Sequence, residues 1–102
     1  MDDTSKLINF AKVILAELGV KEPVLNAPLR YTDDQLDSAV CQFLAPRGSY
    51  TLFLITVRGV GVNAGVYFVY FQGGEELLFA IAYEKAGHYK KFVPKTTWGE
   101  AK

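Results

Sequence analysis

Residues 65–83, GVYFVYFQGGEELLFAIAY, limit the folds open to this chain more than any other stretch. Side chains of a β-strand point alternately to the two faces of a sheet, and here apolar side chains occupy both sets of alternating positions. The pattern predicts two strands joined at a Gly-Gly pair. Both faces of the resulting sheet need cover, which the rest of the chain or a partner must supply.

Length and charge define the class of protein. The chain has 102 residues, half of them hydrophobic, which fits a single domain over 1–102. Its 11 basic and 11 acidic side chains balance, so no net field draws it to nucleic acid or to an anionic membrane. The one cysteine, Cys41, cannot form an internal disulfide. With an acidic start and no long apolar run, we expect a cytoplasmic protein that does not engage a membrane.

The N-terminal half predicts two helices. Apolar residues recur at helical spacing over 4–18, and Gly19 is a natural helix end. A second apolar stripe lies within 33–45, after a capping box formed by Thr32 and Gln35. The proline-containing connector between the helices has room for a short edge strand at Val24 and Leu25.

The C-terminal half changes to a period of two. Strands are predicted over 50–62, 66–72, 77–84 and 88–93, and a tail over 94–102. The expected fold class is α+β, with two N-terminal helices packed on one face of a four-stranded antiparallel meander.

Turn lengths predict which residues share a face. A three-residue loop at 63–65 and a two-residue loop at 73–74 place Phe68 opposite Phe79, and a loop at 85–87 pairs Tyr83 with Tyr89. One face then carries the small residues that helices can approach. The other face carries large side chains that we take as the candidate binding residues: Tyr50, Leu52, Arg58, Phe68, Tyr70, Phe79, Ile81 and Tyr83.

This aromatic face leads to three hypotheses for function. The first is a non-enzymatic interaction module that forms a homodimer through the open face, so that Phe79→Glu or Phe68→Glu gives folded monomers. The second is a small-molecule-binding protein with a pocket there, in which Arg58 orients an apolar or anionic ligand. The third is recognition of nucleic acid, or inhibition of a toxin or nuclease. The C-terminal tail around Trp98 is an alternative cover for the face.

The polar candidates have ordinary structural explanations as well. Arg58 either binds an anion or extends to water. A basic run formed by Lys85, His88, Lys90 and Lys91 either contacts nucleic acid or protects an edge strand, and we favour protection.

Catalysis and metal binding have little support. His88 lacks partners for a metal, and Cys41 has no base except His88. Asp33, Asp34 and Asp37 suit a helix start without a metal. We therefore predict no cofactor, no metal and no catalytic residue, and a binding protein in preference to an enzyme.

Overall fold

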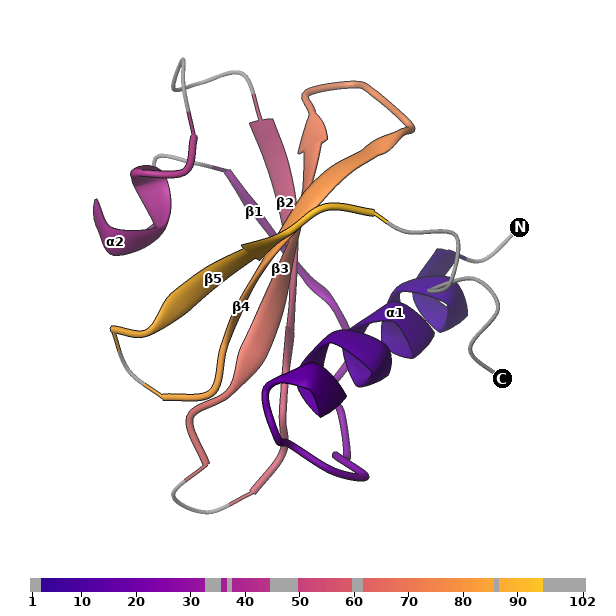
Figure 1. Cartoon of the computed structure of the whole chain (residues 1–102). Coiled ribbons are helices and arrows are strands. Elements are labelled where there is room, and N and C mark those ends of the chain that lie inside the picture. The colour runs from indigo at the N-terminus through magenta and orange to yellow at the C-terminus, as the bar shows by residue number, and fades with distance from the viewer. Residues whose placement is uncertain are drawn as a thin grey trace.

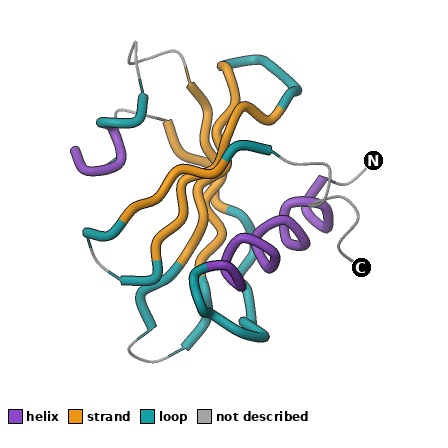
Figure 2. Tube along the Cα trace, in the orientation of Figure 1, coloured by secondary structure: helices purple, strands orange, loops and turns teal. Residues whose placement is uncertain are grey.

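One antiparallel sheet of five strands organises the chain. The computed structural model describes residues 3–32, 36, 38–44, 50–59, 62–85 and 87–94. The strands lie in the order β1-β2-β3-β4-β5, each antiparallel to its neighbours. Figures 1 and 2 show the two helices on opposite sides of this sheet. The elements in chain order are α1 (Asp3–Glu17), β1 (Leu29–Thr32), α2 (Ser38–Cys41), β2 (Tyr50–Thr56), β3 (Gly65–Phe71), β4 (Leu77–Tyr83) and β5 (Tyr89–Phe92).

The first helix confirms the sequence pattern closely. Its buried side chains repeat at three- and four-residue intervals, which places them on one stripe: Leu7, Phe10, Ala11, Ile14 and Leu15. The helix ends at Glu17 and is followed by Gly19, whose φ of 89° is a left-handed conformation that glycine adopts without a steric cost. The Val20 amide donates to the Leu15 carbonyl at 2.9 Å and the Gly19 amide to the Ala16 carbonyl at 3.1 Å, the two bonds of a Schellman cap.

The apolar stripe of α1 packs chiefly on β3 and β4. Phe68 lies at the centre of this contact with no exposed surface, and its ring centroid is 6.5 Å from that of Phe10. Ala80 and Ala82 face the same helix, as the small residues of this strand predict. Their size lets the helix backbone approach the sheet, and a continuous core forms between them.

The second helix differs from its prediction in length and in place. It is one turn, Ser38–Cys41, where 33–45 was expected, and Thr32 belongs to β1 instead of capping it. The apolar stripe is nevertheless used, because Val40 and Leu44 pack against Leu52 and Ile81. That contact lies on the face opposite α1, so the prediction of two helices on one face is wrong. The remaining predicted cap and acidic residues, Asp33, Asp34, Gln35 and Asp37, lie outside the described residues.

The connector after α1 supplies the fifth strand. The strand β1 pairs with β2, with Arg30 opposite Phe53, and forms one edge of the sheet. The anticipated edge position at Leu25 is a single antiparallel bridge to Val57. A strand in this connector was foreseen, but its main length lies four residues further along the chain than Leu25.

The first hairpin has another register than the one predicted. The strand β2 ends at Thr56, which lies opposite Gly65, so residues 57–64 form the connection and Gly65 begins β3. Odd-numbered residues of β2 therefore share a face with even-numbered residues of β3. The predicted three-residue loop instead placed odd-numbered residues of both strands on the same face.

The second hairpin contains a bulge. Tyr70 lies opposite Leu77 as predicted, but Val69 lies opposite Phe79, which leaves Leu78 as an extra residue on β4. Phe68 consequently faces Ala80 and not Phe79. The longer loop and the bulge each reverse which residues share a face. Their effects cancel, so β2 and the residues of β4 after the bulge lie on the faces predicted for them.

The last hairpin confirms the predicted pairing of Tyr83 with Tyr89. Residues 95–102, which include Trp98, lie outside the described residues, as do Val60 and Gly61.

Candidate binding cleft

The predicted binding residues do not form one surface. Tyr50, Leu52, Phe79, Ile81 and Tyr83 belong to the α2 face of the sheet, as the pattern of β2 and β4 indicated. Phe68 and Tyr70 pack in the α1 core instead, because the register of β3 is reversed.

The α2 face is also not open. Leu52 and Ile81 have no exposed surface, and Phe79 is 9 % exposed within the single chain. Val40 and Leu44 supply part of the cover. The face therefore lacks the exposed apolar area on which the homodimer hypothesis depended, although self-association itself stays a prediction.

Four tyrosines form a continuous aromatic cluster across this face. Ring centroids lie 6.3 Å apart for Tyr31 and Tyr67, 6.2 Å for Tyr67 and Tyr83, and 5.3 Å for Tyr83 and Tyr89. Tyr83 lies against Gly65 on the opposing strand, where any side chain would collide with its hydroxyl. Burial raises the pKa of Tyr83, and the nearby phenols of Tyr89 and Tyr31 raise it further.

Arg58 follows the last residue of β2 by two positions and has a structural partner. Its Nε donates to the Asn26 Oδ1 at 3.2 Å, and the Asn26 Nδ2 donates to the Thr56 Oγ1 at 2.7 Å. Backbone bonds join the same segments, from Asn26 to Thr56 at 2.9 Å and from Arg58 to Val24 at 2.7 Å. Arg58 thus helps to hold the connector against the end of β2. It does not line the cleft that Tyr70 lines.

The basic run follows the second edge of the sheet. Lys90 and Lys91 are exposed on β5, and Lys85 and His88 are exposed in the turn before it. The Lys91 ammonium lies 4.5 Å from the centroid of the Phe79 ring, within the range of a cation–π contact. This arrangement fits a protected edge strand, the explanation favoured from the sequence.

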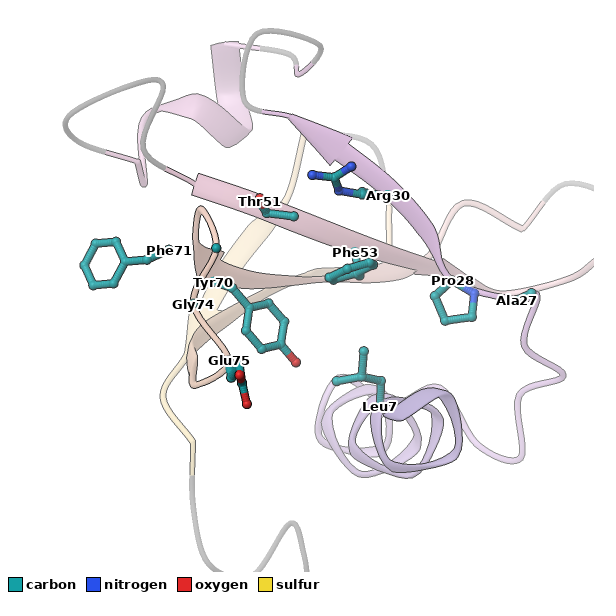
Figure 3. Close-up of a pocket in the computed structure, with 11 residues that line it drawn as sticks. Leu7, Ala27, Pro28, Arg30, Thr51, Phe53, Tyr70, Phe71, Gly74 and Glu75 are labelled. Atoms are coloured by element: carbon teal, nitrogen blue, oxygen red, sulfur yellow. The ribbon is translucent and has the colours of Figure 1, made fainter. Parts of the chain in front are cut away.

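A cleft of about 810 Å³ opens on the α1 face, beside the helix. The helix covers β3 and β4, and the part of the face formed by β1 and β2 is left beside it. Figure 3 shows residues around this space from α1, the connector, β1, β2, β3 and the turn after β3. Its lining residues are Leu7, Ala27, Pro28, Arg30, Thr51, Phe53, Tyr70, Phe71, Gly73, Gly74 and Glu75.

The lining changes from apolar at depth to charged at the rim. Leu7 is buried, and Phe53 and Tyr70 are half-buried, with ring centroids 5.8 Å apart in an edge-to-face contact. Arg30 and Glu75 are exposed at the rim. Such a combination of aromatic walls and a few polar groups is typical of sites that bind small molecules.

Thr51 is the polar group at depth in the cleft. It is 8 % exposed, and none of the described side chains or backbone groups hydrogen-bonds its hydroxyl. A threonine hydroxyl both donates and accepts hydrogen bonds, so the cleft wall offers a ligand one polar group here.

Sequence reasoning identified only Tyr70 among these residues as a pocket residue. The cleft combines α1, the connector, β1, β2, β3 and the β3–β4 turn, which the order of residues does not bring together. The nearest signal is Arg30, a cation next to an aromatic residue in a connector otherwise rich in apolar side chains.

Groups with catalytic or ligating chemistry lie elsewhere. Cys41 is buried, and its Sγ is 3.7 Å from the Leu36 carbonyl oxygen. Neither Cys41 nor His88 lines the cleft. Among the described residues no three histidine, cysteine or acidic side chains gather as metal ligands would. None of the helices in the same part of the chain is long and apolar enough to span a bilayer.

Comparisons with known proteins add no identity: no family model, no curated protein and no solved structure matches the chain.

Proposed function

We propose that this chain is a non-enzymatic binding module that holds a small organic ligand in the cleft between α1 and β1. The observation that carries the proposal is the composition of the 810 Å³ cleft, in which aromatic walls lead to the buried hydroxyl of Thr51 and to a charged rim. This volume lies within the range of about 300–1,000 Å³ that small-molecule sites occupy.

The ligand has an apolar body and a polar head. Phe53, Tyr70 and Leu7 offer the surface that an apolar or aromatic body buries. Arg30 offers a planar cation that binds carboxylate, sulfonate or phosphate groups through two parallel hydrogen bonds. The arginine assigned to the ligand from the sequence, Arg58, is replaced in this role by Arg30.

The direct test is titration with anilinonaphthalene sulfonate, an aromatic anion whose fluorescence rises in apolar surroundings. We expect saturable binding of one probe per chain to the folded protein. Arg30→Gln should weaken binding by about threefold to tenfold, because an exposed cation contributes about 1 kcal/mol. Lys85→Gln is the control, since that cation is also exposed but lies outside the cleft and the connector that lines it.

A second pair of variants tests the space itself. Ala27 is exposed at the cleft, so Ala27→Trp should fill the entrance and reduce probe binding without disturbing the core. Ala16 is exposed on α1 outside the cleft, and Ala16→Trp is its control. Equal effects of Ala27→Trp and Ala16→Trp, or no saturable binding to the wild type, would refute the proposal.

A further inference from the structure

Two opposite charges line the same cleft from different segments of the chain. Arg30 reaches it from β1, and Glu75 reaches it from the turn after β3. Figure 3 shows them on either side of the space that Phe53 and Tyr70 face. Both are exposed, and neither forms an ion pair with another residue that the structure describes.

The two charges lie far apart along the cleft. Arg30 is level with Phe53 and Phe68 in the register of the strands, and Glu75 lies in the turn beyond Phe71. The two residues are therefore separated by β2 and by at least three residues along the strand, about 14 Å at the level of the backbone. A ligand that reaches both residues carries its charges at opposite ends.

We infer that the cleft binds a short zwitterionic peptide, with its carboxylate at Arg30 and its ammonium group at Glu75. This inference rests on the proposed function and specifies its ligand. A ligand with an anion alone offers no opposite charge to Glu75, and one with a cation alone offers none to Arg30. A zwitterion with its charges at opposite ends offers one to each.

The rest of the lining suits the middle of such a peptide. An apolar side chain packs against Phe53 and Tyr70, which form a half-buried aromatic wall. The hydroxyl of Thr51, which has no hydrogen-bond partner among the described residues, lies where it can bond a peptide amide or carbonyl. The cleft thus offers a partner for each polar feature of a peptide backbone and a surface for its side chain.

The test is displacement of the fluorescent probe by the tripeptide Ala-Leu-Ala and two of its derivatives. N-acetylation removes the ammonium charge, and C-terminal amidation removes the carboxylate. We expect the free peptide to displace the probe, and each derivative to bind about threefold to tenfold more weakly, with the difference decreasing at high salt.

Variants assign each end of the peptide to a residue. In Glu75→Gln the acetylated and free peptides should bind equally, and in Arg30→Gln the amidated and free peptides should do so. Glu76→Gln is the matched control, because Glu76 is the exposed neighbour of Glu75 that does not line the cleft. Its preference for the free peptide should equal that of the wild type. Because Arg30→Gln is expected to bind the anionic probe weakly, calorimetric titration measures the affinities of this variant for the peptides directly.

The outcomes separate this inference from the proposed function. Saturable probe binding with no displacement by the free peptide, or displacement that does not depend on acetylation, overturns the peptide assignment and leaves the cleft as a binding site. The absence of binding by both probe and peptide overturns the two together. Wild-type discrimination retained in Glu75→Gln also overturns the assignment of the ammonium group.

Discussion

Gly65 provides the sharpest test of the packing between β3 and β4. It lies opposite Tyr83, whose hydroxyl occupies the space above the glycine. A Cβ atom at residue 65 would lie 2.8 Å from the Tyr83 hydroxyl and 3.1 Å from its Cζ, and 2.9 Å from the Ile55 carbonyl oxygen. One neighbour is a movable side chain and the other is sheet backbone, so relief of one contact leaves the other.

The cost of Gly65→Ala follows from these two contacts. Overpacking of a core by one carbon typically destabilises by about 1–3 kcal/mol. Replacing glycine also restricts the unfolded chain, which returns about 0.4–1 kcal/mol. We therefore expect the free energy of unfolding to fall by about 1–2 kcal/mol, a substantial part of the 5–15 kcal/mol typical of a domain.

Urea unfolding monitored by circular dichroism gives the required free energies. Gly65→Ala is measured alone and in a Tyr83→Leu background, where the aromatic hydroxyl is absent. If the Tyr83 hydroxyl causes part of the cost, Gly65→Ala lowers the free energy of unfolding less in the Tyr83→Leu background. We expect the two costs to differ by at least about 0.5 kcal/mol. The residual cost measures the contact with the Ile55 carbonyl.

Gly19→Ala is the control for a conformational effect. A Cβ there meets nothing within 4 Å, and only the φ of 89° opposes it. Its cost, about 1 kcal/mol, should be the same with Tyr83 or with leucine at residue 83. An equal cost of Gly65→Ala in both backgrounds would refute the steric reasoning, as would stabilisation by that substitution.

Two further predictions concern the two faces of the sheet. Phe68→Glu should unfold the protein and not give folded monomers, because Phe68 has no exposed surface and packs under α1; circular dichroism and gel filtration check this, with Phe68→Leu retaining the fold. Because burial raises the pKa of Tyr83 above the ordinary value of 10.0, the unfolded chain releases that proton more readily than the folded chain. The contribution of Tyr83 to stability is therefore complete below pH 10 and is lost as pH rises beyond it, and Tyr83→Phe should show a smaller alkaline decline in the free energy of unfolding. An identical decline in both proteins would contradict the assignment.

Local pattern predicted the elements better than their arrangement. The stripe of α1, its end at Gly19 and the meander of β2 to β5 are properties of short segments, and the structure confirms them. The register of β3 depended on the length of the loop between β2 and β3. Contacts with a distant segment of the chain set that length. The chain after Thr56 pairs with Leu25 and Val24 in the connector, so β2 separates from β3 earlier than the Asn-Ala-Gly sequence suggested.

The bulge at Leu78 limited the consequences of that error. It changes the parity a second time, so the residues of β2 and most of β4 lie on the faces that were predicted for them. The residues of β3, together with Leu77 and Leu78 beside the bulge, changed sides. That change moved Phe68 into the α1 core and placed Tyr70 at the cleft. A sequence pattern contains no sign of a bulge when both alternative faces are apolar, as they are in this strand.

The position of α2 explains two differences from the prediction. The aromatic face that was expected to be open is covered, and part of the α1 face is left open as the cleft. Two helices on one face would have covered β1 to β4 on that side and left the other side exposed. With Val40 and Leu44 on the opposite face, the aromatic side chains expected to be open are buried, and only α1 remains over β3 and β4. The uncovered part of the α1 face, around Phe53 and Thr51, is the cleft. The same apolar stripe that closes the predicted binding face therefore leaves room for a ligand on the other, and the search for function moves from Arg58 to Arg30.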